Sequence, residues 1–388
     1  MHQLIHVYYQ DILAGIFDHN TRMEMGRFEW LPTFKKEFAS FVDAFDAPEH
    51  GSLYSFNPTI ELPRIFFDQM PGLFQEQLLQ STLMRENENS KHRSPVAWIS
   101  LAGNRGLGAF RFEPFGLPEL NEQTSIDIDQ LVISLKSLFE NTSQKIPVKH
   151  LRNVLRTGLF AHGDSPKALL SINDFTGEVL SGQGSNPDDF QAWILKLDGI
   201  IPTSKSKIPD EFSYYQAAKA CGLRVASTRT MKDGSLTHLL VKRFDRSGHL
   251  KIAYVSYGVW CATAGNYWES VFRKMRQLRM SFVEMEELYK RLVFYYLTNQ
   301  ENIDIATLCF LFSKEEGWCL TPAFNLKPTK KAKNQTIQYL DDSETKMTKE
   351  TLLQFGKKLN LRKSVTYFSE IEKKLIDFKQ SHNSITKL

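Results

Sequence analysis

The hydrophobic pattern changes near residue 257, and this change most constrains how the 388-residue chain can fold. Before that point, short apolar runs of strand type alternate with a few helical segments. After it, helices dominate, with the sequences WESVFRKMRQLR, FVEMEELYKRLVFYYLT and TKETLLQFGKKLNL. A strand-rich part followed by a helical block is typical of an α+β protein, so we expect that fold class.

Four segments follow from this pattern and from the polar stretches that interrupt it. The first mixes strands and helices, the second is a connector with one helix, the third is strand-rich around a single helix, and the fourth is helical. Their bounds are residues 1–115, 116–148, 149–256 and 257–388. With 42% hydrophobic and 24% charged residues, the composition is that of a globular protein with room for two or three cores.

Local patterns predict several single elements. The stretch LIHVYYQDILAGIF predicts two strands around a turn near Gln10, and LPRIFFDQMPGLFQEQLLQSTL predicts a helix broken at Pro71. The spacing of apolar residues over 126–141 predicts a further helix. In the third segment, the strand-like runs KALLSIN, AWILKLDG and THLLVKRFD accompany the helix EFSYYQAAKACGL.

Residues 103–108, GNRGLG, superficially suggest a phosphate-binding loop. They lack the G-x-G-x-x-G order, and the strand-like AFRF follows them where a dinucleotide site needs a helix. We therefore expect a glycine-rich turn that enters a strand.

Simple counts argue against several classes of protein. We expect neither a membrane span nor a secretion signal, because no window reaches eighteen apolar residues and the first residues lack a basic region before an apolar run. The four cysteines show no zinc-site spacing, which predicts reduced thiols and a cytoplasmic protein. The ten histidines form no H-E-x-x-H or comparable cluster, so we expect no structural metal.

Positive charge is concentrated near the C-terminus. The whole chain carries a formal charge of +4, but residues 327–388 contain 14 Lys and Arg against 7 Asp and Glu. Such a run is either a solvated helical face or a surface for an acidic partner or a nucleic-acid backbone. No aromatic ladder accompanies it, which disfavours a platform for single-stranded nucleic acid.

Residues 295–312, YYLTNQENIDIATLCFLF, predict the end of a buried helix, a polar loop and a short strand. This is the outline of a kinase catalytic loop, in which an Asp accepts the substrate proton and an Asn a few residues later holds a metal ion. The candidate positions here hold Asn302 and Thr307. The outline is therefore present without the usual chemical groups.

Taken in order, segments over most of the chain resemble the HipA family, the toxin components of bacterial toxin–antitoxin pairs. The segments are RIFFDQMPG, SLAGNRGLGAFRF, GDSPKALL, AWILKL, EFSYYQAAKACGL, LLVKRFDR, GWCLTPAFNL and IQYLDDSETKMTKETLLQFGKKLNL. Each is weak alone, but eight in the family's order are specific. The resemblance implies a bilobal Ser/Thr-kinase-like fold with an extra N-terminal α/β subdomain and a helical C-terminal lobe.

The resemblance also assigns three residues to a nucleotide-phosphate site. Lys196 lies on the family's lysine strand and Glu211 on the following helix, where in kinases an ion pair orients the lysine toward the phosphates. Because an ammonium in an apolar run needs an anionic neighbour, a purely structural pair is the alternative. Lys167, in the family's Gly-x-x-Pro-Lys loop, is a third phosphate contact or a solvated loop lysine.

The positions that should carry the chemistry depart from the family. Asn302 stands where the family has its catalytic Asp, Asp304 at a His position and Thr307 at the metal-binding Asn. Asn325 replaces the metal-binding Asp of the family's Y-D-L motif. An amide cannot accept the hydroxyl proton, and Mg²⁺ prefers carboxylate oxygen, so we expect neither catalysis nor metal binding. A shifted loop that offers Asp304 as a substitute base is the alternative.

Two further departures agree with a degenerate site. Phe160 occupies the position of the family's autophosphorylated serine, and SYGVWCA (residues 256–262) replaces the polar P-Q-E-D-x-C-Q segment. Gly258 and Val259 thus stand where the family has Glu and Asp. Engineered inactivation would explain Asn302 and Asn325 alone, so we interpret the degeneration as mostly native.

A HipA-like pseudokinase that acts through binding is the function we expect. The resemblance implies a small helix-turn-helix antitoxin as partner, with operator DNA contacted through the complex and the basic C-terminal face, and we expect no cofactor. The first alternative is an active Ser/Thr kinase toxin that uses ATP and magnesium and phosphorylates a translation factor such as an aminoacyl-tRNA synthetase. The second is a regulatory scaffold that inherited only the fold.

Overall fold

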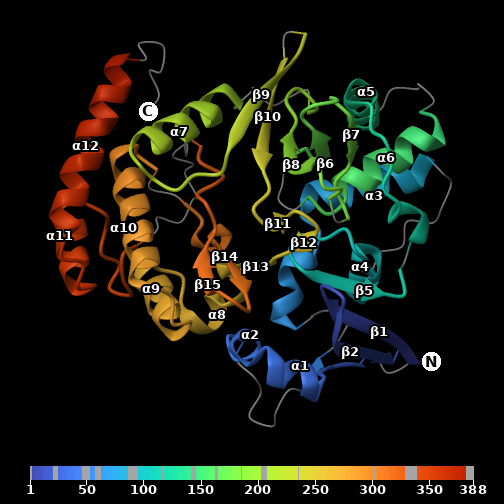
Figure 1. Ribbon diagram of the computed structural model, residues 1–388, viewed down its shortest axis with the longest axis horizontal. Coiled ribbons are helices and arrows are strands. Elements are labelled where there is room, and N and C mark those ends of the chain that lie inside the picture. Colours follow the sequence, from blue (N-terminus) through green and yellow to red (C-terminus); the bar gives the residue numbers. More distant parts are fainter. Residues whose placement is uncertain are drawn as a thin grey trace. The chain divides into compact units, whose positions relative to one another are not determined.

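The computed structural model of the protein (Figure 1) describes residues 2–20, 25–45, 53–56, 63–85, 95–115, 117–140, 146–161, 165–184, 186–201, 208–234, 236–300, 303–327 and 339–381. The chain forms two compact units, Met1–Ser206 with Arg229–Val255, and Lys207–Thr228 with Ser256–Leu388. The second unit includes residues 207–228, which the sequence pattern groups with 149–256. The division into four segments remains a prediction.

The first unit begins with a five-stranded antiparallel sheet of order β4-β3-β2-β1-β5. Its strands are β1 (His2–Tyr9), β2 (Ile12–Asn20), β3 (Met25–Trp30), β4 (Leu53–Phe56) and β5 (Phe110–Glu113). The predicted pair of strands around Gln10 is confirmed by β1 and β2. In β1, Ile5, Val7 and Tyr9 are buried, which is the period of two of a strand with one covered face.

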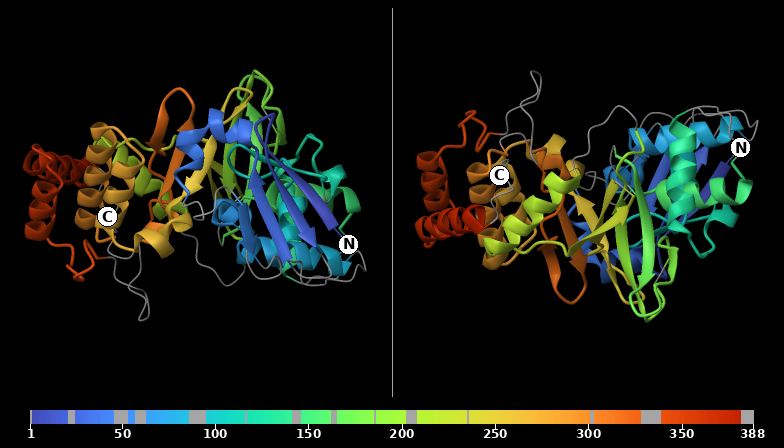
Figure 2. Two further views of the ribbon diagram at one scale, coloured as in Figure 1. Left: turned by 90° about the horizontal axis from the view of Figure 1, so that it is seen from below. Right: turned by 90° about the horizontal axis from the view of Figure 1, so that it is seen from above.

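Short helices pack against the buried face of this sheet (Figure 2). They are α1 (Pro32–Glu37), α2 (Ala39–Val42), the 3₁₀ helix η1 (Arg64–Gln69) and α4 (Pro95–Ala102), whereas the longer α3 (Leu73–Arg85) packs against α5 and α6. The predicted break at Pro71 is confirmed, since it lies between η1 and α3. Aromatic rings fill the core between the layers; Phe28 and Phe66, for example, meet edge to face with centroids 4.9 Å apart.

A second five-stranded sheet of the same unit has the order β7-β6-β8-β10-β9. Its strands are β6 (Lys167–Asn173), β7 (Val179–Ser181), β8 (Phe190–Lys196), β9 (Thr228–Asp233) and β10 (Leu236–Lys242). Three of them confirm the predicted runs KALLSIN, AWILKLDG and THLLVKRFD. The remaining elements of this unit are η2 (Pro118–Leu120), α5 (Ile128–Phe139), α6 (Val148–Gly158), β11 (Arg246–Ser247) and β12 (Leu250–Lys251), and β13 (Ala253–Ser256) leads the chain onward.

Helices α5 and α6 pack together beside the second sheet, and α6 contacts β6. Helix α5 confirms the prediction for residues 126–141, and its N-cap Asp127 accepts the amide of Gln130. Helix α6 was missed, although Leu151, Val154 and Leu155 form a buried stripe of helical spacing.

The second unit is mainly helical, as the sequence predicts. It contains α7 (Ile208–Ala220), η3 (Tyr257–Val259), α8 (Cys261–Ala264), α9 (Trp268–Gln277), α10 (Phe282–Leu297), η4 (Ile305–Thr307), β14 (Cys309–Ser313), β15 (Gly317–Leu320), α11 (Lys349–Lys358) and α12 (Ser364–Ser381). Helix α12 packs against α10, α7 and α11, which lie beside it in Figure 2.

The segment IQYLDDSETKMTKETLLQFGKKLNL resembles a strand–helix element of the family, and residues 337 and 338 at its start lie outside the described residues. In the described part of its stretch, residues 339–348, the chain turns before α11 begins at Lys349. The reason is local, because the Asp341 carboxylate accepts the amides of Ser343 (3.2 Å) and Thr345 (3.1 Å). Aspartate commonly stabilises turns in this way, and the hydrogen bonds compete with an extended chain.

Candidate functional site

Two of the predicted phosphate-binding lysines lie opposite each other in the first unit. Strands β6 and β8 are antiparallel, and their register pairs Lys167 with Lys196. Lys196 is only 8% exposed, and Lys167 is half-buried. Side chains at directly opposed positions have Cβ atoms about 5 Å apart, and like charges there repel. An anion at this end of the sheet would relieve that repulsion, and phosphate binding by this pair stays a prediction.

Glu211, the third of these residues, lies on α7 and belongs to the second unit, where it is buried. One turn further along α7, the hydroxyl of Tyr215 accepts the backbone N–H of Asn325 at 2.9 Å. Burial, together with the nearby charge of Glu211, raises the pKa of Tyr215 well above its usual value. Tyr215 thus links the helix that carries Glu211 to the backbone of Asn325. The predicted pair of Glu211 with Lys196 stays a prediction.

Asn325 itself is half-buried and has a left-handed backbone conformation, with φ at 55°. Asparagine tolerates this conformation better than most residues because its short polar side chain can form local hydrogen bonds. The position therefore places a neutral amide side chain on a left-handed backbone. This backbone conformation is one that asparagine adopts readily.

The segment that leads to Asn325 is held to α10 by ion pairs in which Glu284, Glu287 and Arg291 are buried and Arg224 is exposed. Arg224 Nη1 donates to Glu284 at 2.8 Å, and the same carboxylate accepts the amide of Leu320 at 2.8 Å. Arg291 donates to Glu287 at 3.0 Å and to the carbonyl of Thr321 at 2.7 Å. Burial alone would raise the pKa of Glu284, but the hydrogen bonds that it accepts from Arg224 and from Leu320 outweigh burial and lower it.

The catalytic-loop segment is described only from residue 303 onward, so Asn302 lies outside the described residues. Asp304 is exposed, and its Oδ1 accepts the amide of Ala306 at 3.0 Å as the N-cap of η4. The hydroxyl of Thr307 donates to the carbonyl of Asp304 at 2.7 Å. Asp304 and Thr307 therefore stabilise one short turn. The roles of substitute base and metal ligand remain untested predictions for them.

The segment that replaces the family's polar stretch is packed against this turn. Val259 is buried, and a Cβ on Gly258 would lie 3.3 Å from the carbonyl oxygen of Ala306. The hydroxyl of Tyr257 shares a hydrogen bond with Ser270 at 2.7 Å. Any side chain at position 258 would bring its Cβ to this distance, so the carbonyl oxygen of Ala306 would have to give way by a few tenths of an ångström.

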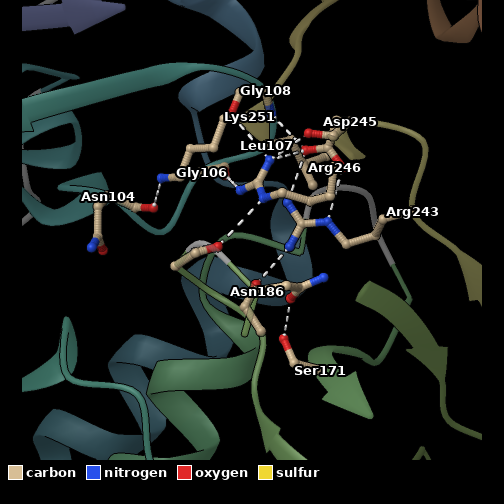
Figure 3. A network of polar contacts seen from close by, with 12 residues as sticks. Asn104, Gly106, Leu107, Gly108, Ser171, Asn186, Arg243, Asp245, Arg246 and Lys251 are labelled. Carbon is tan, nitrogen blue, oxygen red and sulfur yellow. Dashed lines mark hydrogen bonds and ion pairs between the residues drawn. The ribbon is translucent and has the colours of Figure 1, made fainter. Parts of the chain in front are cut away.

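Sequence reasoning missed a buried network of charges in the first unit (Figure 3). Asp245 is 2% exposed and accepts from Arg243 Nε (2.9 Å) and Nη2 (2.8 Å), from Arg246 Nη1 (2.7 Å) and from the amide of Gly108 (2.7 Å). Burial would raise the pKa of Asp245, but the two guanidinium groups hold it well below its usual range. The run KRFDR (residues 242–246) was the sequence signal for this network, but the sequence does not reveal that Gly108 is a partner of its aspartate.

The same network explains the glycine-rich turn at residues 103–108. Arg246 donates to the carbonyls of Gly106 (3.3 Å) and Gly108 (3.2 Å), and Lys251 donates to the carbonyl of Asn104 at 2.7 Å. Strand β5 follows the turn, as predicted. The backbone groups of this turn are thus used inside the protein, which is consistent with a structural turn.

The described residues offer neither a metal site built from His, Cys, Asp or Glu nor a membrane-spanning helix. No group of three or more His, Cys, Asp or Glu side chains in that part of the chain is arranged to hold a metal ion. None of its helices is long and apolar enough to span a membrane. All four cysteines are described, and all are free.

Comparison with known proteins places these features in context. The family model of the HipA-like C-terminal domain matches residues 159–378. No curated protein matches the chain. Among solved structures, the chain is similar to one titled "Shewanella oneidensis MR-1 Toxin Antitoxin System HipA, HipB and its operator DNA complex", with 15% identity, a TM-score of 0.67, and coverage of 98% of this chain and 91% of that one. A Helicobacter pylori proinflammatory kinase, CtkA, gives 12% identity and a TM-score of 0.32, with 50% and 89% coverage.

Proposed function

Because the chain belongs to the family with the HipA-like C-terminal domain, we propose that it is a HipA-type protein that acts by binding a partner and does not transfer phosphate. The HipA-like α+β fold expected from the sequence is confirmed. The observation that carries the proposal is Asn325. It is a neutral amide where the family has a metal-binding carboxylate, on a segment held to α10 by ion pairs.

The residues at the degenerate positions do not fit an ATP–magnesium group. Mg²⁺ is normally bound by carboxylates and phosphate oxygens in near-octahedral geometry. Here Asn325 offers an amide, the hydroxyl of Thr307 is donated to a carbonyl, and the carboxylate of Asp304 caps a turn. The opposed lysines Lys167 and Lys196 still suit an anion. The arrangement favours anion binding without a catalytic metal.

The proposed partner is a small helix-turn-helix antitoxin, with operator DNA contacted by the complex. The similar Shewanella oneidensis HipA was solved with HipB and operator DNA, which motivates the proposal for this chain. Exposed cations lie in the last turn of α11 and just beyond it, namely Lys357, Lys358, Arg362 and Lys363. Lys358 forms an ion pair with Glu269 at 2.8 Å, so the other three are the better candidates for phosphate contacts. The basic stretch 328–334 lies outside the described residues.

Incubation of the purified protein with labelled ATP and magnesium tests the proposal. We expect no incorporation, either by the protein itself or by aminoacyl-tRNA synthetases. The variant Asn302→Asp with Asn325→Asp should stay inactive, because Thr307 and Gly258 remain unsuited to the chemistry. Stoichiometric incorporation that disappears in Asp304→Ala would contradict the proposal and would identify an active kinase with a substitute base.

Binding is measured separately by calorimetry with a purified helix-turn-helix protein encoded beside this chain. Micromolar or tighter affinity, unchanged when magnesium is removed, is the expected result. Absence of any association would leave a scaffold role without the antitoxin as the better account.

A further inference from the structure

One hydrophobic side chain of the first unit is almost completely in water. Phe175 is 94% exposed, at the tip of the hairpin between β6 and β7. The next most exposed large hydrophobic residues in the described part of the chain, Leu73 and Val283, are 67% exposed. Single exposed apolar residues are common, but burying a phenylalanine is worth about 1.5–3 kcal/mol. Phe175 therefore offers binding free energy that the folded chain does not use.

The turn that carries Phe175 is fixed by hydrogen bonds. The side-chain oxygen of Asn173 accepts the amides of Phe175 (2.9 Å) and Thr176 (3.1 Å). The backbone of Asn173 also bonds with Gly177 and Glu178, each at 2.9 Å, and Gly177 takes the positive φ of 74° that closes the turn. The loop needs little further ordering to bind, which reduces the entropic cost of association.

The turn is also supported from the neighbouring strands. Asp174, next to Phe175, accepts from Arg229 Nη1 at 2.6 Å. The guanidinium of Arg229 in turn lies 4.4 Å from the ring centroid of Trp193 in β8. Phe175 is thus presented on a hairpin that is tied to the sheet, as an anchor residue in an interface would be.

The surroundings of Phe175 are acidic. Asp174 and Glu178 belong to the turn, and Asp188 and Asp189 precede Phe190, which pairs with Asn173 at the same end of the sheet. Arg229 neutralises Asp174, and His249 contacts Asp188 at 2.5 Å. The remaining negative charge disfavours nucleic-acid phosphates and anionic lipid as the binding surface. It favours a protein with an apolar pocket bordered by Lys and Arg.

We propose that this hairpin tip, residues 173–178, is a docking anchor that inserts Phe175 into a basic-rimmed apolar pocket of the helix-turn-helix partner. The inference rests on the proposed function, since it requires that partner. A small DNA-binding protein carries the excess of Lys and Arg that complements the acidic rim. Contact through this tip requires neither nucleotide nor metal.

The test compares the affinity of the purified helix-turn-helix partner for the wild-type 388-residue chain and for three variants of it. Phe175→Ser should raise Kd by about 30-fold or more, as expected for an aromatic anchor. Asp189→Lys should slow association and make it less dependent on salt. Leu250→Ser is the matched control, because Leu250 is 61% exposed in the same unit but lies outside the tip. It should change Kd by less than about twofold.

The outcomes separate the two proposals. A large effect of Phe175→Ser with none of Leu250→Ser supports docking through the tip. Equal affinities of wild type and Phe175→Ser overturn the docking and leave the partner intact. If the wild-type chain does not bind the partner, the proposed function fails, and docking with it. If Phe175→Ser abolishes self-association in sedimentation and leaves partner affinity unchanged, a second copy of the chain occupies the tip and the docking is overturned.

Discussion

Replacing Asp245 by Asn should remove a large part of the stability of the first unit. The carboxylate is the only acidic group in the described network of Figure 3, and it faces two guanidinium groups and the amide of Gly108. Asparagine keeps the shape but loses the charge and one acceptor, so Arg243 and Arg246 are left buried without their counterion. Breaking a buried ion pair in this way costs about 3–5 kcal/mol. The free energy of unfolding of a typical protein is only about 5–15 kcal/mol in total.

The free energy of unfolding is measured by urea denaturation followed by tryptophan fluorescence and circular dichroism. Asp188→Asn is the control, because its carboxylate is 85% exposed in its contact with His249, and it should change stability by less than about 0.5 kcal/mol. The pH dependence supplies a second readout. The folded pKa of Asp245 is depressed, so its contribution is complete above the unfolded value of 3.8 and declines as pH falls below it. The loss in free energy of unfolding caused by Asp245→Asn should therefore be smaller in acid than at neutral pH. A loss below about 1 kcal/mol at neutral pH would refute the reasoning.

Three other results are expected. Burial lowers the pKa of His238, so the stability of the wild-type protein should fall as the pH drops below the unfolded pKa of 6.5. In His238→Gln, the urea midpoints measured at pH 8 and at pH 5 should differ less than in the wild type. An equal difference in the two proteins would contradict this reasoning. Tyr215→Phe leaves the backbone N–H of the half-buried Asn325 without the hydroxyl that accepts it, and thermal melts should show a loss of stability of about 1 kcal/mol. In Gly182→Ala the new Cβ would lie 2.6 Å from the backbone of β6, which should lower the free energy of unfolding by about 1–3 kcal/mol. Gly184→Ala is the control, because its new Cβ would meet nothing within 4 Å, and it should leave stability unchanged in the same assay.

The local elements of this protein could be predicted from its sequence because their signals lie within a few residues. Alternation in LIHVYY gives β1, and the proline–glycine pair at Pro71 separates η1 from α3. The helix and the strand expected at the two ends of residues 295–312 are confirmed by α10 and β14. The family was likewise readable, since the resemblance depends on residue type and order.

The arrangement of the candidate site depended on tertiary structure. Whether Lys167 opposes Lys196 is a matter of strand register, and a slip of one residue would place the two on opposite faces of the sheet. The hydrogen bond between Asp245 and Gly108 joins residues 137 positions apart, so no local periodicity encodes it. Each charge in that network is stable in the interior only because the others are present. Such contacts form only when the whole unit packs, because the pairing of buried charges depends on their distances and orientations in space. Sequence patterns report only which face of an element is apolar.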